Sequence, residues 1–571
     1  MEDKSLEISG LSRAFQEAME EARRSEFVDR LASGDATLWK KGAEDAALIN
    51  NSLGWRFLPE FMSAKAEDIM EFASEVKDGG YTEVVLLGMG GSSLAPLVLA
   101  GVFGNALGWP RITVLDSTDP VAIGEVRERA TTKTLFIVSS KSGSTVEPNT
   151  LFKFFYGVIS ALQVDNPGDN FIAITDPGSA LEELGRAKNF RRVFLNPSDI
   201  GGRFSALSFF GLVPAALAGV DIKRLIEGAA RAAVSASNAH DVEAQAGIRL
   251  GGAIGAAALS GRDKLTLFVS DKLPAFGLWV EQLVAESTGK ENRGIIPVTG
   301  EPLGSCEDYG SDRVFVDVRL ASESADDEGL TALREAGHIV IKIRPSDIYE
   351  LGFEFMRWEI ATALAGRMLG INPFDQPDVE SAKILARARL EEKSAGAPGF
   401  FHSEGGQKIY LSDAVLDVPG LRETLEKKGA ASALKALFEN MGSNDYIALL
   451  SYYSIFDTAL EAAQKDLQSR LMLKTRSAVQ AGFGPRYLHS TGQIHKGGPD
   501  SGIYLIFTHK VTDDVKIPEA SFTFSELELS QAYGDMEALM KRGRRVALFE
   551  ADSPAATGFQ EAAKTILEAL A

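Results

Sequence analysis

The sequence predicts an α/β protein with two doubly wound parallel-sheet domains behind an N-terminal helical arm. Three observations predict this fold. Short apolar runs recur along the chain, each run is closed by Gly, Ser or Asp, and stretches with helical spacing lie between the runs. Apolar runs without polar alternation are typical of strands that are buried on both faces, as in parallel sheets covered by helices.

The first 55 residues are the predicted helical arm. Apolar residues recur there at helical spacing among many charges, as in LSRAFQEAMEEARRSEFVDRL. A charged helical segment of this kind fits either a surface arm or the junction to another domain. We therefore assign residues 1–55 to the arm and begin the first domain at residue 56.

The first parallel-sheet domain is expected over residues 56–220. Its strands are expected in TEVVLLGMGGSS, ITVLDSTDP, TLFIVSSKSGS, FIAITDPGS and RVFLNPSDIGG. Helical segments separate these runs, which favours parallel strands. In such sheets ligands bind beyond the carboxyl ends of the strands, so the loops that follow the runs are the places to look for a site.

The second domain is expected over residues 221–571. Its strands are expected in KLTLFVSDKL, DRVFVDVRL, GHIVIKIRP, DYIALLSYY, GIYLIFTHK and RRVALFEAD. A stretch near residues 391–429 is rich in Lys, Glu, Gly and Ser, and we interpret it as an exposed insertion. The similar pattern of apolar runs in the two domains suggests a distant internal duplication.

The composition excludes several classes of function. The 571 residues are 45% hydrophobic and 24% charged, and the net charge of −20 argues against nucleic acid or an anionic membrane as partner. The single cysteine, Cys306, excludes an intrachain disulfide and fits a reducing compartment. The N-terminus lacks an apolar leader, and the longest apolar stretch, near residues 204–220, is short for a bilayer span. We expect a soluble, cytoplasmic protein.

Two loops carry residues suited to binding an anion. The first, Gly88-Met89-Gly90-Gly91-Ser92-Ser93, has glycines that permit close approach, and the helix that follows favours negative charge at its start. Alone, a structural strand–turn–helix explains this loop equally well. The second loop, residues 139–145, contains four serines, one threonine, one lysine and one glycine after a predicted strand. Hydroxyl and N–H groups at a helix start predict a phosphate cradle there.

Several separated segments resemble the motifs of one family. SKSGSTVE resembles the phosphate loop of sugar isomerase (SIS) domains and of the phosphoglucose isomerase family, and GMGGSSLAP resembles that family's first glycine-rich loop. NPSDIGGRFSALS is similar to its arginine motif, VAESTGK to its catalytic-glutamate motif and NPFDQPDVESAK to its lysine motif. Together they span roughly residues 86–383. The resemblance implies that both parallel-sheet domains are of the SIS type.

The resemblance is strongest to the isomerase portion of bacterial transaldolase–phosphoglucose isomerase fusions. Too few residues precede Arg56 to hold a transaldolase barrel. The resemblance implies an aldose–ketose isomerase that interconverts glucose-6-phosphate and fructose-6-phosphate through a cis-enediol. We expect neither a cofactor nor a metal, because no cluster of His, Cys, Asp or Glu in the sequence has metal-ligand spacing.

The resemblance also implies roles for particular residues. Isomerisation needs a base, stabilisation of an oxyanion, and an acid–base group that opens the sugar ring. Glu286 would be the base, Arg203 would stabilise the enediolate, and Lys383 would donate to the ring oxygen or to hydroxyls. The substrate would be bound by Gly91, Ser92, Ser140, Lys141 (through its backbone), Ser142 and Thr145 at the phosphate and by Gln282 and Glu147 at the hydroxyls.

The ring-opening histidine departs from the family's usual order. In most members its motif lies between the glutamate and lysine motifs, where this sequence has His338 at the start of a predicted strand. A better match, YLHSTGQIHKGG, follows the lysine motif. We therefore predict that His489 opens the ring, with His495 and His338 as competitors, and that part of the second domain is rearranged in order.

The family usually forms homodimers in which this histidine comes from the neighbouring subunit, so the resemblance implies a homodimer. Two alternative functions stay open. A dual phosphoglucose/phosphomannose isomerase would keep every motif, because the motifs do not select the epimer at carbon 2. A non-catalytic sugar-phosphate-binding SIS module would keep the serine loop but would need no base. The joint presence of Glu286, Arg203, Lys383 and His489 argues against that module.

Overall fold

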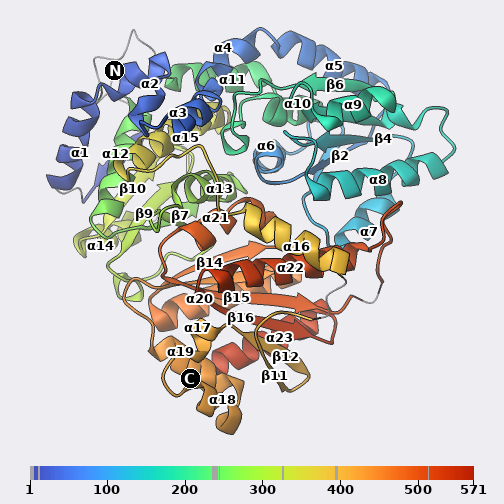
Figure 1. The fold of residues 1–571 in the computed structure, drawn as a ribbon. Helices are drawn as coiled ribbons and strands as arrows, with labels where there is room; N and C mark the ends of the chain where they lie inside the picture. Colours follow the sequence, from blue (N-terminus) through green and yellow to red (C-terminus); the bar gives the residue numbers. More distant parts are fainter. Residues whose placement is uncertain are drawn as a thin grey trace.

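The computed structural model describes residues 5–10, 13–233, 242, 245–323, 327–392, 396–511 and 513–571 of the chain. Over these residues the chain forms three sheets with helices packed around them (Figure 1). The predicted α/β class with parallel sheets is confirmed. None of the helices in this part of the chain is long and apolar enough to cross a membrane.

The first sheet has the strand order β3-β2-β4-β5-β6, and all of its neighbouring strands are parallel. Every residue of β2 and β4 is buried, which explains why their sequences lack polar alternation. The strand order reverses between β2 and β4, and ligands of parallel α/β sheets bind beyond the carboxyl ends of two such strands. The strands are β2 (Glu83–Gly88), β3 (Arg111–Leu115), β4 (Thr134–Ser139), β5 (Phe171–Thr175) and β6 (Arg192–Leu195).

The second sheet has the order β1-β10-β9-β7-β8. Its parallel strands are β7 (Lys264–Val269), β8 (Ile296–Thr299), β9 (Arg313–Val318) and β10 (Ile339–Ile343). Strand β1 (Leu6–Ser9) runs antiparallel beside β10, so the N-terminal arm also supplies an edge strand. Beyond β1 the arm contains the helices α1 (Arg13–Arg24), α2 (Phe27–Ser33) and α3 (Ala43–Asn50).

A third sheet holds the strands in the last part of the chain, in the order β11-β12-β16-β15-β13-β14. Four of its strands are mutually parallel, and two pair in antiparallel fashion at one edge. The parallel strands are β13 (Tyr446–Ser451), β14 (Ala478–Phe483), β15 (Gly502–His509) and β16 (Arg545–Ala551). The antiparallel strands are β11 (Phe400–Glu404) and β12 (Gln407–Leu411). We call residues 396–571 the C-terminal unit.

The region 221–571, expected as one domain, therefore contains two sheets. The stretch near 391–429, interpreted as an insertion, carries β11 and β12 as well as α17 (Asp413–Leu416) and α18 (Leu421–Lys428). Its residues 393–395 lie outside the described residues. Apolar runs of the two sheets look alike in sequence, and periodicity does not say which strands pair. The domain boundaries stay a prediction.

The remaining helices surround the three sheets. In the first part of the chain they are α4 (Leu58–Ser63), α5 (Ala66–Asp78), α6 (Leu94–Phe103), α7 (Pro120–Arg129), α8 (Val146–Ala161), α9 (Ala180–Ala187), α10 (Phe209–Leu217) and α11 (Ile222–Ala232). Later ones are α12 (Ala246–Leu259), α13 (Phe276–Thr288), α14 (Asp327–Glu335), α15 (Leu351–Met368), α16 (Glu380–Glu392), α19 (Ala430–Glu439), α20 (Thr458–Thr475), α21 (Gly492–Gly497), α22 (Phe524–Lys541) and α23 (Ala555–Ala569).

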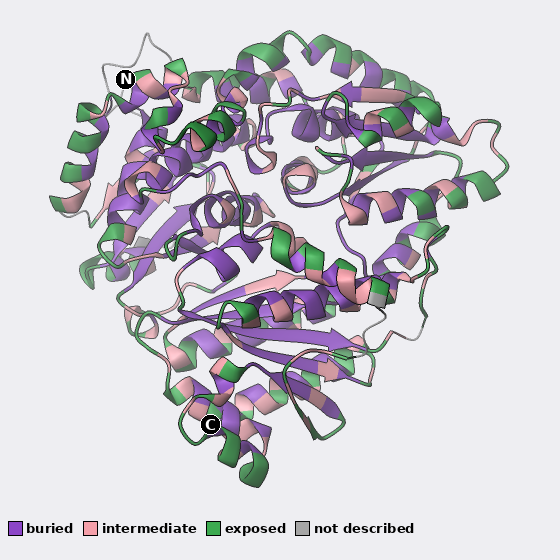
Figure 2. Ribbon diagram, in the orientation of Figure 1, coloured by how far each residue is buried: buried purple, intermediate pink, exposed green. Residues whose placement is uncertain are grey.

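Apolar packing ties the sheets together, and their strands are largely buried (Figure 2). The largest apolar cluster joins the N-terminal arm to the first and second sheets, and it includes α15, which is buried over most of its length. A separate cluster joins the first sheet to the C-terminal unit. In it, Phe524 of α22 packs edge-on against Phe154 of α8, with ring centroids 5.8 Å apart. The C-terminal unit is thereby docked beside the helix that follows the serine loop.

Candidate active site

The glycine-rich loop after β2 lies where the separated motifs meet. Gly90 has a φ of +55°, and a Cβ there would lie 2.7 Å from the carbonyl oxygen of His489 and 2.8 Å from Gln282 Nε2. A Cβ on Gly91 would lie 2.1 Å from the carbonyl oxygen of Gly202. No larger residue fits these positions without a shift of the backbone. The glycines therefore let three distant parts of the chain approach one another.

The serine loop after β4 forms a small network of hydroxyl groups. The N–H of Gly143 donates to Ser140 Oγ at 3.2 Å, and that hydroxyl donates to Thr145 Oγ1 at 3.3 Å. The hydroxyl oxygens of Ser142 and Ser144 are 2.9 Å apart. Thr145 occupies the N-cap position of α8, but its side chain makes no capping hydrogen bond. The hydroxyls thus gather at a helix N-terminus, where an anion is favoured.

Two further residues predicted for the phosphate lie in fixed positions. The ammonium of Lys141 is 2.8 Å from Asp176 Oδ2 and donates to the carbonyl of Ser198 at 2.9 Å. Its side chain is therefore occupied outside the loop, as expected if Lys141 contributes its backbone. Ser92 accepts a hydrogen bond at its carbonyl oxygen from Ser139 Oγ at 3.0 Å. This bond joins the glycine-rich loop to the end of β4.

Glu286 lies on α13, one helical turn after Gln282. Gln282 Nε2 donates to Glu286 Oε2 at 3.2 Å, and Arg203 Nη1 lies 3.4 Å from Glu286 Oε1. The side chain of Glu286 is 15% exposed. Both carboxylate oxygens are therefore held by donors while the group stays accessible, which suits a base that must meet a substrate.

Arg203 is buried and held by four acceptors. Its Nε donates to Ser287 Oγ at 2.7 Å and its Nη1 to Gln376 Oε1 at 3.0 Å. Its Nη2 donates to the carbonyls of Pro373 and Asp375 at 2.7 and 2.9 Å. Burial lowers the pKa of Arg203, and neighbouring carboxylates oppose that shift. A guanidinium fixed in this way is a preorganised positive charge.

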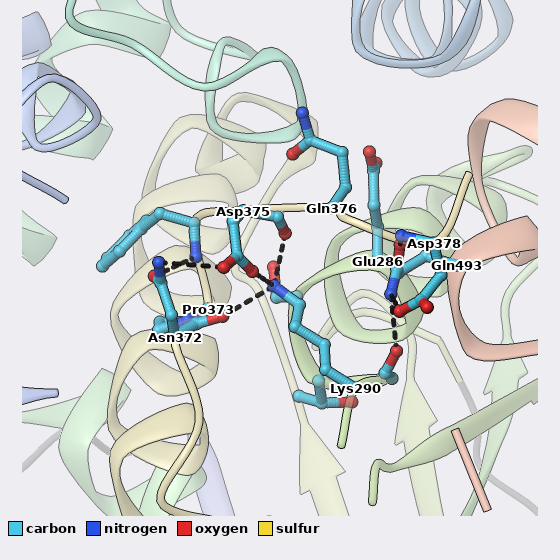
Figure 3. A network of polar contacts seen from close by, with 12 residues as sticks. Glu286, Lys290, Asn372, Pro373, Asp375, Gln376, Asp378 and Gln493 are labelled. Carbon is cyan, nitrogen blue, oxygen red and sulfur yellow. Dashed lines mark hydrogen bonds and ion pairs between the residues drawn. The ribbon is translucent and has the colours of Figure 1, made fainter. Parts of the chain in front are cut away.

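Lys290 is a site residue to which the sequence assigned no role. Its Nζ donates to the carbonyl of Asn372 at 2.6 Å, to Asp375 Oδ1 at 2.7 Å and to the Asp375 carbonyl (Figure 3). Burial lowers the pKa of Lys290 to about 7, and the charge of Arg203 adds to this effect. Lys290 thereby ties down the segment whose carbonyls hold Arg203. It closes the VAESTGK motif, which is the one signal in the sequence that could have marked it.

His489 lies at the end of a 3₁₀ turn, Arg486–His489, in the C-terminal unit. Its Nε2 is 3.0 Å from Glu147 Oε1, and its carbonyl accepts from Gln282 Nε2 at 2.7 Å. Burial raises the pKa of Glu147, but the charge and hydrogen bond of His489 outweigh this and leave that pKa below its ordinary value. The sequence placed Glu147 at sugar hydroxyls. The structure adds its pairing with His489.

The two competing histidines lie elsewhere. His495 is fully buried, its Nε2 is 3.0 Å from Gln480 Oε1, and burial holds its pKa well below the ordinary value. His338 packs edge-on against Phe315 with ring centroids 5.1 Å apart, and burial lowers its pKa too. Of the three candidates, His489 is the one beside Gln282 and the serine-loop helix within the described chain.

Lys383 lies at the margin of this cluster. It is on α16, where its ammonium is 3.7 Å from Glu380 Oε2 and its side chain is half exposed. Its charge still contributes to lowering the pKa of Glu147. Its predicted role as a donor to the sugar stays a prediction.

Comparison with known proteins agrees with the motifs. Residues 54–295 match the family model for phosphoglucose isomerase. The glucose-6-phosphate isomerase of Rubrobacter xylanophilus is 28% identical over 411 residues, which cover 62% of this chain and 91% of that protein. The glucose-6-phosphate isomerase of Mycoplasmopsis pulmonis is 29% identical over 390 residues, which cover 60% of this chain and 90% of that protein. Each of these alignments therefore leaves more than a third of this chain uncovered.

Two solved structures share the fold. The hypothetical protein TT0462 from Thermus thermophilus aligns with a TM-score of 0.56 and 26% identity, covering 67% of this chain and 99% of that one. A glucose-6-phosphate isomerase from Chlamydia trachomatis aligns with a TM-score of 0.53 and 20% identity, covering 67% and 86%. Fold and site are those of a parallel α/β protein with a glycine- and serine-lined site beyond its strands. Within that class, residues 54–295 of the chain are similar to the phosphoglucose isomerase family.

Proposed function

We propose that the chain interconverts glucose-6-phosphate and fructose-6-phosphate through a cis-enediol intermediate. The observation that carries the proposal is the pairing of Glu286 with Arg203, whose Oε1 and Nη1 atoms lie 3.4 Å apart. A base beside a fixed cation can remove a proton and stabilise the charge that results. Similarity to known proteins supports the same reaction, because both relatives named above are glucose-6-phosphate isomerases.

Proton transfer is assigned to Glu286. Its carboxylate takes the proton from carbon 2 of the open-chain aldose, the electrons of that C–H bond form the carbon 1–carbon 2 double bond, and the carbonyl electrons move to oxygen 1. A proton passes from the carbon 2 hydroxyl to oxygen 1, so the negative charge of the enediolate moves to oxygen 2. The same carboxyl group then returns the proton to carbon 1, which yields the ketose. The guanidinium of Arg203 offsets negative charge on the enediol oxygens, and because it is already hydrogen-bonded on four sides it need not reorganise.

Ring opening is assigned to His489 with Glu147. A histidine gives and takes protons near neutral pH, as opening a cyclic sugar requires. When His489 Nε2–H donates to Glu147 Oε1, the neutral ring presents Nδ1 as the proton acceptor. Lys383 is assigned a supporting donor role at the sugar. The phosphate is assigned to the hydroxyls of Ser92, Ser140, Ser142 and Thr145 and to the backbone of Gly91 and Lys141, with Gln282 near the sugar.

We further propose that one chain forms a whole site. The homodimer implied by the resemblance rested on a histidine supplied by the neighbouring subunit. His489 contacts Glu147 and Gln282 of its own chain, so that reason for a dimer does not apply here. A cytoplasmic location is also proposed, on the grounds of the single cysteine, Cys306, and of the assigned reaction.

A coupled assay with glucose-6-phosphate tests the reaction. Wild type should turn the substrate over, and Glu286→Gln should lower kcat about 100- to 10,000-fold with little change in substrate binding, because only the proton transfer is lost. Glu291→Gln is the matched control, since that side chain is 56% exposed beside Lys40. Mannose-6-phosphate in a parallel assay tests the dual activity. Binding of sugar phosphate without turnover by wild type would contradict the proposal.

A further inference from the structure

We propose that Gln531 of α22 is a positioning residue that fixes the carboxylate of Glu147 for its work with His489. Gln531 Nε2 donates to Glu147 Oε1 at 2.7 Å, and Gln531 Oε1 accepts from Thr118 Oγ1 at 2.9 Å. The Oε1 atom of Glu147 therefore meets both the glutamine amide and the histidine ring. The inference rests on the proposed isomerase function, in which His489 opens the ring.

The orientation of the amide is determined by its two partners. A carboxylate offers acceptors alone, so the NH₂ end of Gln531 must face Glu147. The Thr118 hydroxyl then completes the arrangement as donor to the amide oxygen. Thr118 is fully buried, and Glu147 and Gln531 are 5% and 6% exposed, so water competes little for these bonds. A buried network with every partner satisfied holds its members in one geometry.

The helix that carries Gln531 is itself firmly placed. A capping box begins α22, in which Thr523 Oγ1 accepts from the N–H of Glu526 and Glu526 returns a bond to the N–H of Thr523. Phe524 and Leu527, on the same helix, pack in the apolar cluster of the first sheet. Gln531 follows Leu527 by one turn, so its side chain leaves the helix on the docked side.

The network joins three parts of the fold through Gln531 and Glu147. Thr118 follows β3 of the first sheet, Glu147 lies in the first turn of α8, and both Gln531 and His489 come from the C-terminal unit. Without Gln531, His489 would be the one member of this network that still contacts the buried carboxylate of Glu147. Removing the amide donor should allow the carboxyl group to rotate and should raise the pKa of Glu147, because the buried carboxylate then loses a hydrogen bond that favours its charged form.

Other titratable groups near Glu147 must be considered when a pH effect is assigned to it. His489 and Lys383 lower the pKa of Glu147 through their positive charges. The charge of Glu147 in turn contributes to the raised pKa of the Tyr452 phenol. Substitution of Gln531 leaves Lys383 and Tyr452 in place, so a shift in the acid limb of a pH profile reports on Glu147.

The experiment compares Gln531→Met, which keeps the size of the side chain and removes the amide, with wild type and with Gln468→Met. Gln468 is another buried glutamine, and its Nε2 donates to the carbonyls of Thr299 and Val479 at 2.7 and 2.6 Å. Gln531→Met should lower kcat for glucose-6-phosphate about tenfold, with KM within about twofold of wild type. The acid limb of kcat/KM against pH should move upward. Gln468→Met should leave both quantities unchanged.

A double-variant cycle separates positioning from a general structural effect. In the His489→Asn background, Gln531→Met should cause no further loss, because the residue through which it acts is gone. A further tenfold loss there, or an unchanged kcat and pH profile in the single variant, would overturn the inference. If Gln531→Met does not fold, Thr118→Val tests the same network and should shift kcat and the acid limb in the same direction. A wild type without activity would contradict the proposed function instead.

Discussion

Two glutamates on α13 show how the surroundings of a carboxyl group set its behaviour. Glu286 lies beside Arg203 with a partly exposed side chain. Glu281 is 4% exposed, and its Oε2 accepts from Thr299 Oγ1 at 3.1 Å. Burial raises the pKa of Glu281 to about 8, and the Thr299 bond offsets only part of this rise. Glu281 is therefore largely protonated at neutral pH, whereas Glu286 faces a cation.

Glu281→Gln should make the folding stability of the protein less sensitive to rising pH. The pKa of Glu281 is about 8 in the folded chain against an ordinary 4.5, so between these values the folded state keeps a proton that the unfolded state releases. Wild-type stability therefore falls with pH across this window, by up to about 1.4 kcal/mol per pH unit, and the amide variant lacks that slope.

Urea unfolding at several pH values between about 5 and 8 measures the effect. The variant should gain unfolding free energy relative to wild type as the pH rises, with Glu291→Gln as the exposed control. Parallel stability curves for Glu281→Gln and wild type would show that the buried carboxyl does not titrate in this way.

Single residues differ in how far a sequence can reveal them. Glu286 and Arg203 stand inside recognisable motifs, and the structure brings them within 3.4 Å. Gln531 stands in no motif, and its partner Glu147 is 384 residues away along the chain. A pairing of that kind depends on how α22 docks, which local pattern and propensity do not encode. The same holds for Lys290, whose acceptors are two carbonyl groups and the Asp375 carboxylate in a distant segment.

At the scale of elements, the strands and loops of the first sheet follow closely from the sequence. β2 and β4 are buried apolar runs that end in glycine or serine, and both were expected. The division between the second and third sheets was not expected, because β12 pairs with β16 across a long stretch of chain. β1 is four residues long and lies in an otherwise helical arm, too short for a periodic signal.

Gly91→Ala should disrupt the meeting point of the site's elements. An added Cβ would lie 2.1 Å from the Gly202 carbonyl oxygen and 2.9 Å from the Arg203 backbone nitrogen, and neither is a flexible side-chain end. The turn that carries Arg203 must then shift relative to the glycine-rich loop. Because a displacement of about 1 Å can cost about 100-fold in rate, kcat/KM should fall by about that factor.

Steady-state kinetics and denaturant unfolding together check this expectation. Gly124→Ala in α7 is the matched control, since a Cβ there meets nothing within 4 Å. It should keep full activity and gain up to about 1 kcal/mol of stability, as alanine does in a helix interior. Wild-type kcat/KM in Gly91→Ala would show that the loop can shift without consequence.

At the scale of the whole molecule, the C-terminal unit and the first sheet meet at the candidate site, although they lie far apart along the chain. Arg486 Nη2 is 2.6 Å from Asp116 Oδ1, directly beyond β3, and this pair fixes the turn that ends at His489. The apolar cluster between α8 and α22 holds the same two parts together. The rearranged motif order predicted from the sequence is compatible with this arrangement, because a site depends on spatial positions rather than on chain order.

This arrangement predicts that catalytic variants cannot complement each other. Glu286→Gln and His489→Asn each remove one catalytic group. If the site is confined to one chain, every chain of either variant has a defective site. If the histidine instead crossed to a neighbouring subunit, random mixed dimers would restore about a quarter of the sites. Co-expressing the two variants and assaying the purified mixture distinguishes these cases, with wild type co-expressed with Glu286→Gln as the control for expression. The activity of the mixture should equal the average of the activities of the two variants alone. This expectation holds for a monomer and for a dimer, because a dimer with two self-contained sites does not restore activity either.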